Sequence, residues 1–279
     1  IMINIIYAVG LNLILGVAGQ FSLGHAGFIA IGSYSGAILG KMMNGLPGLF
    51  AGMAVGVVIS VIVAFLVGLP TLRLKGDYLA IATLGVAEII RVAVTNMKIT
   101  NGAAGISGVP LTNTWTITYI ALGLTTILIL NYTFSSAGRA TYAVLQDEIA
   151  AESMGVQVTK YKILAFVLGA ATASIGGTLS ATTLGAVTPS DFTFMKSIDV
   201  LIIVVFGGIG SFTGSFVAAV LLGIINLVLQ PFGQLRMIIY AVALILIMIF
   251  RPGGLLGTWE FKLGDFKFSK KKETKESGK

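Results

Sequence analysis

The sequence predicts an all-α membrane protein, a polytopic bundle of transmembrane helices with broken or re-entrant segments. Hydrophobic residues make up 56% of the 279 residues and charged residues only 10%, whereas a soluble domain is roughly 25% charged. Long uncharged runs recur along the chain, and about 20 apolar residues are enough to cross a bilayer. The 36 glycines favour close helix packing and helix breaks, because lipid gives helices no hydrophobic reason to associate.

The first predicted membrane segment covers residues 1–40, which carry no formal charge when His25 is neutral. A run of this length is enough for two crossings, and the Gly-Gln-Phe-Ser-Leu-Gly sequence of residues 19–24 supplies the break between them. The chain starts with Ile1, already within the apolar run, so we expect the native start to lie upstream, with room for one further helix. No signal peptide is indicated, because a charged n-region and a cleavage site are missing.

The remaining apolar runs predict the rest of the bundle. Single spans are expected at residues 49–69, 78–97, 115–134, 163–183 and 236–250. Residues 200–235 are uncharged but are interrupted by the glycine-rich cluster at 207–210, so we expect two segments that meet at a turn, or a re-entrant pair. Trp115 fits an interfacial anchor, and Arg236 and Arg251 can snorkel from the ends of the last span.

Charge divides the chain into residues 1–261, a single membrane domain, and residues 262–279, a basic tail. We expect the tail to be a solvated, disordered cytoplasmic segment, with a regulatory or anionic-lipid contact as the alternative. Placing residues 70–77, 135–162 and the chain beyond residue 250 in the cytoplasm puts thirteen Lys and Arg side chains inside. Four, Lys41, Lys98, Lys196 and Arg236, are then outside, and this bias agrees with the positive-inside rule.

Several function classes are excluded by what the sequence lacks. The chain has no cysteine and one histidine, which excludes thiolate and multi-histidine metal sites. It contains no Walker A or HExxH motif, and the glycines at 207–210 do not open a βαβ unit as a dinucleotide site would. Much of the net charge of +7 sits in the tail, so it does not indicate nucleic-acid binding. We therefore expect no enzyme, no cofactor on this chain and no nucleic-acid partner; any ATP is hydrolysed by a separate subunit.

The strongest functional signal is the loop at residues 138–162, which carries six charged side chains between uncharged runs. The pattern predicts a helix over residues 142–154, with an apolar face and with Gly155 as its C-terminal glycine. Such a helix could dock into a cleft of a partner, or it could be an ordinary amphipathic helix at the membrane surface. The residues expected to couple to a partner are Glu148, Ala150, Ala151, Glu152 and Gly155.

Polar side chains within the apolar runs are the other candidates. Glu88 and Arg91 lie at i and i+3 of one predicted span, so they can pair with each other or line a transport path. A second group clusters in the first two segments and either makes interhelical hydrogen bonds or lines an aqueous path. Its members are Asn4, Asn12, Gln20, Ser22 and His25, of which the first three differ by eight residues and could share a helix face.

Together these motifs resemble the permease subunits of branched-chain amino acid ABC importers, and among them the longer M-type of the two paired permeases. The resemblance covers nearly the whole chain. The residues that carry it are 7–13, 19–28, 74–85, 88–91, 101–106, 148–155, 160–162 and 207–211. One departure is Ile149, because the general importer motif has Glu before the paired alanines and this chain has Glu148 one residue earlier.

The resemblance implies an all-helical permease in the cytoplasmic membrane of a bacterium or archaeon, moving branched-chain or other hydrophobic amino acids by alternating access. It implies three kinds of partner besides the bilayer: a second permease, two ATPase subunits that hold the ATP, and an extracytoplasmic solute-binding protein. The region from Ala150 to Gly155 would be the coupling element. The glycine-rich residues 101–108 are either a flexible connection or part of the surface that receives the binding protein.

Three other interpretations stay open from the sequence. Related permeases carry urea or short amides on a similar scaffold. An ion-coupled secondary transporter could use Glu88, Arg91 and His25. A membrane scaffold without any pathway is the third. Genomic context is the cheapest discriminator. Neighbouring ATPase and binding-protein genes favour the amino acid importer or the urea and amide importer, and their absence favours the secondary transporter or the scaffold.

Overall fold

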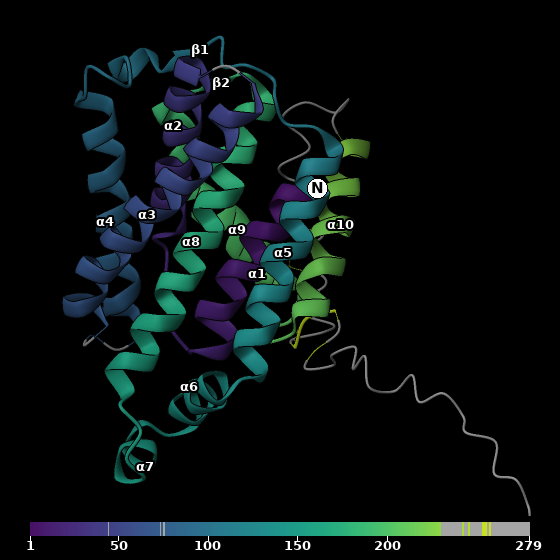
Figure 1. The fold of residues 1–279 in the computed structure, drawn as a ribbon. Helices are drawn as coiled ribbons and strands as arrows, with labels where there is room; N and C mark the ends of the chain where they lie inside the picture. The colour runs from purple at the N-terminus through teal and green to yellow at the C-terminus, as the bar shows by residue number, and fades with distance from the viewer. Residues whose placement is uncertain are drawn as a thin grey trace, which may run out of the picture.

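The computed structural model describes residues 1–43, 45–72, 74, 76–229, 242, 245, 253–255 and 257. Long helices run side by side along one direction and form a single bundle (Figure 1). Its elements are α1 (Met2–Asn12), the π-helical η1 (Leu13–Val17), α2 (His25–Met43), α3 (Leu46–Thr71), α4 (Asp77–Asn96), η2 (Gly102–Ala104), β1 (Ile106–Ser107), α5 (Trp115–Phe134), α6 (Ser136–Gln146), α7 (Glu148–Ser153), α8 (Val158–Leu184), β2 (Ala186–Val187), η3 (Pro189–Phe192), α9 (Phe194–Gly207) and α10 (Phe212–Leu229).

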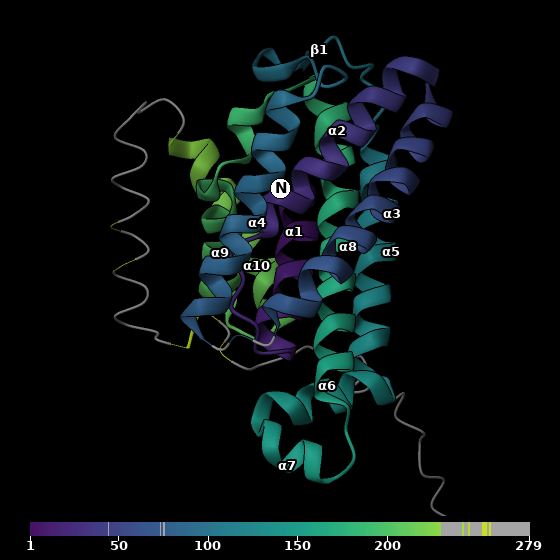
Figure 2. The same cartoon turned by 90° about the vertical axis from the view of Figure 1, so that its left-hand side faces the viewer.

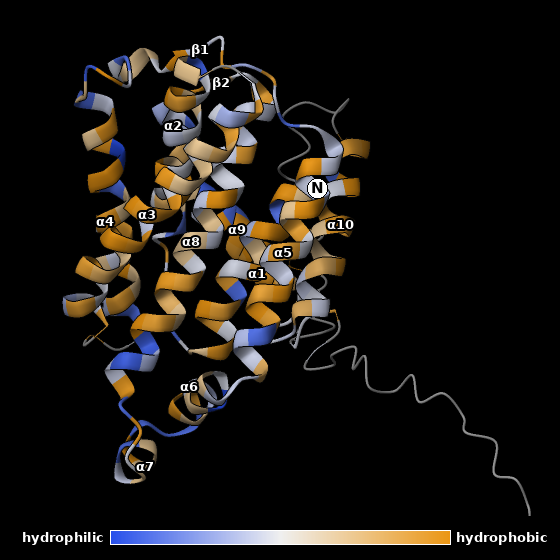
Figure 3. Ribbon diagram, in the orientation of Figure 1, coloured by the Kyte–Doolittle hydropathy of each residue, from blue (hydrophilic) through white to orange (hydrophobic). Residues whose placement is uncertain are grey.

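Five described helices, α3, α4, α5, α8 and α10, are long and apolar enough to cross a membrane, and Met2–Val17 forms a shorter apolar helix. The outward faces of the bundle are largely apolar, while hydrophilic residues gather towards its two ends (Figure 3). The predicted all-α membrane bundle is confirmed, and α5 has the predicted bounds. The predicted span 236–250, apart from Val242 and Ile245, and the tail 262–279 lie outside the described residues.

The predicted break at residues 19–24 separates α1 from α2. The helix ends in the wider turns of η1, where the Ala18 amide donates to the Leu13 carbonyl (3.1 Å) and the Gln20 amide to the Ile14 carbonyl (3.0 Å). An extended stretch then leads to His25, the first residue of α2. A π-helical turn is rare and often lies at a functional site.

The centre of the bundle is the mutual packing of α2, α3 and α8. The buried face of α3 consists mainly of small residues at every fourth position: Gly48, Gly52, Gly56, Ser60, Ala64 and Gly68. A Cβ atom on Gly52 would lie 2.7 Å from the Gly36 Cα of α2. The backbones therefore touch directly, as in other membrane helix pairs with small residues at this spacing.

Side-chain hydroxyls fasten α2 to α8. Ser33 Oγ donates to the Gly177 carbonyl and Thr178 Oγ1 to the Gly32 carbonyl, each at 2.9 Å. A Cβ on Gly32 would lie 2.0 Å from the Ser174 carbonyl oxygen, so no larger residue fits without moving backbone. Both hydroxyls reach backbone carbonyls across the interface only because the helices are this close.

One small sheet supplements the helices. β1 and β2 pair antiparallel, with Ile106 opposite Val187 and Ser107 opposite Ala186. The Val109 amide donates to the Gly185 carbonyl (2.9 Å), and Asn101 Nδ2 to the Gly105 carbonyl (2.9 Å). The glycine-rich residues 101–108 are therefore held by hydrogen bonds within the segment and to residues 185–187.

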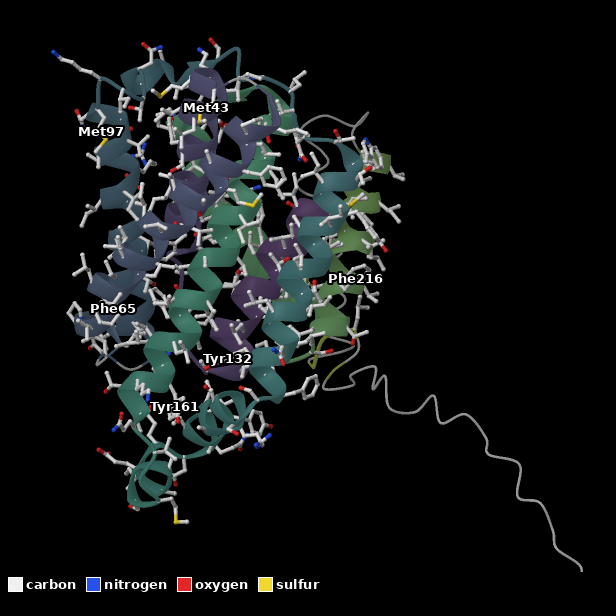
Figure 4. The ribbon with its side chains drawn as sticks, in the orientation of Figure 1. Met43, Phe65, Met97, Tyr132, Tyr161 and Phe216 are labelled. Carbon is white, nitrogen blue, oxygen red and sulfur yellow. The ribbon has the colours of Figure 1, made fainter. Side chains whose placement is uncertain are left out.

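The bundle has two different ends (Figures 1 and 2). Helices α6 and α7 form one end, and η2 with the small sheet forms the other. Met43 and Met97 lie toward the sheet end, Tyr132 and Tyr161 toward the α6–α7 end, and Phe65 and Phe216 at the sides (Figure 4). Residues 135–162 thus lie at the opposite end from Met43 and Met97, the neighbours of Lys41 and Lys98, as the charge pattern requires.

One predicted helix start is wrong. Lys196 was expected in an outer loop before a helix that starts at residue 200, but α9 begins at Phe194 and includes it. Its ammonium lies over the ring of Tyr7, which is buried in α1. Two charges in the first turns of an apolar run made the helix look shorter than it is.

The α2–α8 contact can be tested with Gly32→Val. Its side chain would meet backbone that cannot yield, so we expect the free energy of unfolding in detergent to fall by roughly 3 kcal/mol or assembly to fail. Gly123→Val in α5 is the control, because a Cβ there meets nothing within 4 Å. Equal stability of the two variants would contradict the backbone contact.

Sidedness can be tested by cysteine labelling, since the chain has no native cysteine. Gln146→Cys and Lys98→Cys place single exposed thiols at opposite ends. In intact cells, an impermeant maleimide should label Lys98→Cys and spare Gln146→Cys, and inverted vesicles should reverse the pattern. Labelling of Gln146→Cys from outside would overturn the orientation.

Candidate functional site

The charged loop folds into two short helices instead of one. The predicted helix over 142–154 is wrong, because α6 ends at Gln146 and α7 starts at Glu148. Asp147 stands between them in extended backbone, and its Oδ1 accepts from the amides of Ile149 (2.9 Å) and Ala150 (3.1 Å). Aspartate is a strong N-cap and a weak helix former, so it starts a new helix where the apolar pattern alone predicts continuity.

The end of α7 is the predicted one. Gly155 has a φ of +84°, the left-handed conformation that favours glycine. The Gly155 amide donates to the Glu152 carbonyl (2.9 Å) and the Val156 amide to the Ala151 carbonyl (3.0 Å). This pair of bonds is the Schellman motif, and it fixes how the chain turns from α7 into α8.

Helix α7 presents apolar side chains at the polar end of the molecule. Ile149 is 76% exposed and Met154 is 84% exposed, with Ala150 and Glu152 also exposed. Ala151 is only 6% exposed, so only the first alanine of the predicted pair faces outward. α7 lies beyond the ends of the long helices (Figure 2), so its apolar side chains are available to a protein partner.

An ion pair within this loop and two contacts with the break between α1 and α2 hold the loop in place. Lys162, at the start of α8, forms an ion pair with Glu148. Gln20 Nε2 donates to the Lys162 carbonyl (2.9 Å), and Gly19 lies against Leu145 of α6 so closely that a Cβ there would be 2.5 Å from Leu145 Cδ1. Gln20 therefore helps to anchor the loop at residues 138–162 to the break between α1 and α2.

Asn12 is a structural link between α1 and α10. Its Oδ1 accepts from the Gly210 amide (2.9 Å), and its Nδ2 donates to the Ser211 carbonyl (2.8 Å) and to Ser215 Oγ (2.9 Å). Asn12 therefore makes hydrogen bonds to the segment that begins another helix, which is the first of the two alternatives predicted for this group of polar residues. The shared helix face expected for Asn12 and Gln20 does not exist, because the helix ends at Val17.

The start of α2 lies inside the bundle and is held by side chains of neighbouring helices. The Leu23 amide donates to Thr83 Oγ1 of α4 (3.1 Å), and the Ala26 amide to Ser197 Oγ of α9 (2.9 Å). Ser22 Oγ accepts from the Gly24 amide (3.3 Å) and so stabilises the turn before the helix. These bonds satisfy backbone groups that a helix break leaves unpaired within a membrane.

His25 is buried beside these bonds and close to the backbone of Tyr7. Among the described residues, neither nitrogen of His25 forms a hydrogen bond that meets ordinary distance and angle criteria, and neither does the Tyr7 hydroxyl. Unsatisfied polar atoms in an interior are uncommon and point to a role beyond packing.

Glu88 and Arg91 pair on α4. Arg91 Nε donates to both carboxylate oxygens of Glu88 at 3.0 Å, and Nη2 also contacts Oε1. The side chains are nevertheless 45% and 28% exposed, respectively, in a helix that is apolar enough to span a membrane. Charges on the lipid-facing side of a membrane helix are costly, so we expect this flank of α4 to face water or another subunit.

The sequence analysis did not identify Lys196 and Asp199 as a pair of charges on one helix. Lys196 and Asp199 lie at i and i+3 of α9, and Lys196 Nζ is 5.7 Å from the centre of the Tyr7 ring. The i, i+3 spacing of two charges at the edge of an apolar run, already noticed for Glu88 and Arg91, could have identified them.

The chain was compared with known proteins. Residues 1–250 match the family described as branched-chain amino acid transport system / permease component. The high-affinity branched-chain amino acid transport system permease protein LivM of Salmonella typhimurium is 37% identical, over 91% of this chain and 68% of that protein. The corresponding LivH of Escherichia coli is 25% identical over 90% of each chain, and a probable LivM of Methanocaldococcus jannaschii is 25% identical over 88% of this chain and 78% of that protein. No solved structure was found to match.

The Glu88–Arg91 pair can be tested by a double-mutant cycle. Glu88→Gln alone leaves an uncompensated cation at membrane depth, so we expect it to lower the yield of assembled protein more than Glu88→Gln with Arg91→Gln does. The coupling energy, from folded yield and unfolding in detergent, should be about 1 kcal/mol or more. Additive losses would contradict direct pairing and give the two residues separate roles.

Proposed function

The chain belongs to the family of branched-chain amino acid transport system permease components, and from that premise we propose that it is the M-type membrane permease of an ABC importer. It moves branched-chain or other hydrophobic amino acids inward across the cytoplasmic membrane of a bacterium or archaeon. Transport proceeds by alternating access between two conformations. The single observation that carries the coupling part of this proposal is the exposed apolar surface of α7 at the polar end of the bundle.

The α7 surface is proposed to dock in a cleft of a separate ATPase subunit. An exposed Ile149 and Met154 flank the small Ala150, an arrangement that suits a short helix lying in a groove. ATP is held and hydrolysed by that partner, and this chain supplies no nucleotide-binding residue. Two such subunits, one for each permease of the pair, complete the cytoplasmic side.

Rigid attachment makes α7 suited to transmit movement. Asp147 fixes its start, the Schellman turn at Gly155 fixes its end, and the Glu148–Lys162 ion pair holds it to α8. A displacement of α7 by its partner would then also displace α8, because no flexible loop lies between the two helices. ATP binding in the partner would bias the permease toward one conformation in this way.

The exposed flank of α4 is proposed to face the second permease and the path between the two. Glu88 and Arg91 are paired but half-exposed in the isolated chain, and a second protein or water is needed to keep them out of lipid. At the opposite end, the ordered surface of residues 101–108 and the small sheet is proposed to receive the extracytoplasmic binding protein.

Docking can be tested with Ala150→Trp. The residue is exposed, so the variant should insert and fold normally, while its indole blocks close approach of the ATPase. We expect solute-stimulated ATP hydrolysis and uptake by the reconstituted complex to fall together, by at least about tenfold. Val58→Trp, on the exposed apolar face of α3, is the control for bulk and should retain both activities.

The same assay separates this proposal from its rivals. Normal ATP-driven uptake in Ala150→Trp would contradict docking through α7. Uptake that needs an ion gradient and no ATP would indicate a secondary transporter, and uptake of urea or acetamide in preference to leucine would indicate an amide importer.

A further inference from the structure

Two opposite charges on α9 lie one turn apart without forming a salt bridge. Lys196 and Asp199 form no salt bridge with each other or with any charged group in the part of the chain that the structure describes. This distinguishes them from Glu88 and Arg91, which lie at the same spacing on α4 and do pair. Asp199 is exposed in the isolated chain and Lys196 is half-buried.

The position of these charges along the bundle follows from their neighbours. Ser197, between them, accepts a hydrogen bond from Ala26 at the start of α2. α2 runs from there to Met43 at the sheet end, a distance of about 26 Å at 1.5 Å per residue. The depth from the opposite end follows from α4. Thr83, which accepts from the Leu23 amide, lies about 9 Å along α4 from the first residue of that helix, Asp77. A hydrocarbon layer about 30 Å thick that covers the long helices of the bundle would therefore enclose both charges.

The cation of Lys196 forms no close ion pair among the described residues and interacts with the Asp199 carboxylate only at longer range. Its ammonium faces the ring of Tyr7, a neutral aromatic group, at 5.7 Å from the centroid. Both nitrogens of His25 are buried near the backbone of Tyr7 and lack a well-formed hydrogen bond among the described residues, while the buried Tyr7 hydroxyl lies near Ser180. The cation of Lys196 and the buried imidazole of His25 thus lie on two helices that are joined, next to both residues, by the bond between Ala26 and Ser197.

We propose that Lys196 and Asp199 form a subsite for the α-carboxylate and the α-ammonium of the amino acid in transit. The proposal rests on the proposed function of the chain as an amino acid permease. A zwitterion enters a low-dielectric interior at acceptable cost only if both of its charges are met, and this pair offers one partner for each. The apolar residues around the pair then suit a hydrophobic side chain.

The two charges bring no evident stability to the isolated subunit. An unpaired charge at membrane depth is destabilising, and replacing such a group by an uncharged one of similar size is often neutral or stabilising. Transporters with discontinuous membrane helices commonly bind their solute near the bilayer midplane, at the ends of the broken helices. α2 begins at this level, and α9 begins within one turn of it.

The test uses the complete reconstituted complex with its binding protein, radiolabelled leucine and four variants. Lys196→Met and Asp199→Asn remove one charge each, Lys196→Arg keeps the cation, and Lys41→Met removes an exposed cation from the outer end of α2 as the matched control. Leucine uptake and solute-stimulated ATP hydrolysis are measured together, with thermal stability of each complex in detergent.

We expect Lys196→Met and Asp199→Asn to lower leucine uptake per ATP hydrolysed by at least about tenfold. Stimulated ATP hydrolysis should stay within about twofold and stability should be unchanged or higher, since α7 is intact and a buried charge is gone. Lys196→Arg and Lys41→Met should transport nearly as well as the wild type. This pattern differs from a docking defect, in which uptake and ATP hydrolysis fall together.

Three results would overturn the subsite. Uptake per ATP within about twofold of wild type in both charge-removing variants would show that the solute does not need them. Loss of stability or of assembly in Lys196→Met would assign the pair to packing against the second permease. Failure of the wild-type complex to take up any hydrophobic amino acid would remove the proposed function and this subsite with it, whereas the first two results leave the function standing.

Discussion

Direct backbone contact between α2, α3 and α8 is the constraint on which the other elements depend. Lipid chains are as apolar as leucine, so helices in a membrane gain little from burying large side chains and must gain from close approach. The small residues at every fourth position of α3 make that approach possible, and Ser33 and Thr178 add hydrogen bonds that only close backbones allow. Of the five candidate membrane spans, only α8 is largely buried, whereas α3, α4, α5 and α10 each leave most of their surface exposed in the isolated chain.

A rigid centre allows the chain to break helices elsewhere. Each break releases backbone groups that lipid cannot satisfy, so a break is tolerated only where protein groups replace the lost bonds. Around the start of α2, Thr83 and Ser197 supply acceptors. Near the start of α10, Asn12 accepts a hydrogen bond from the Gly210 amide and donates one to the Ser211 carbonyl. The polar residues that the sequence singled out are therefore placed at breaks, and for Asn12, Gln20 and Ser22 this accounts for their bonds.

The sequence predicts the parts of the fold that local composition controls. The span Trp115–Phe134, the breaks near residues 19–24 and 207–210, and the turn at Gly155 all follow from hydropathy or from the special conformations of glycine. The helix over 142–154 was wrong because apolar periodicity outweighed the capping preference of Asp147 in the prediction.

Other features depend on tertiary contacts and could not be read from spacing. Gln20 lies eight residues after Asn12, but the π-helical end of α1 removes it from that helix face and places it against Lys162. Lys196 looked like a loop cation because a charge at the edge of an apolar run usually marks the membrane surface. Only the bond between Ala26 and Ser197 reveals its depth.

The short segment between α1 and α2 connects the two regions proposed to work in transport. At one end, Gln20 binds the start of α8, where Lys162 also holds α7 through Glu148. Six residues later, Ala26 binds α9 between its two charges, while Leu23 binds α4. A contiguous chain of bonds therefore leads from the docking helix to the mid-depth charges, and it runs beside the rigid α2–α3–α8 centre. Such a chain is a physical route for coupling, and it becomes a mechanism when both ends shift the same two-state equilibrium. This arrangement suits the proposed importer, in which ATP would act on α7 and the solute would bind at Lys196 and Asp199.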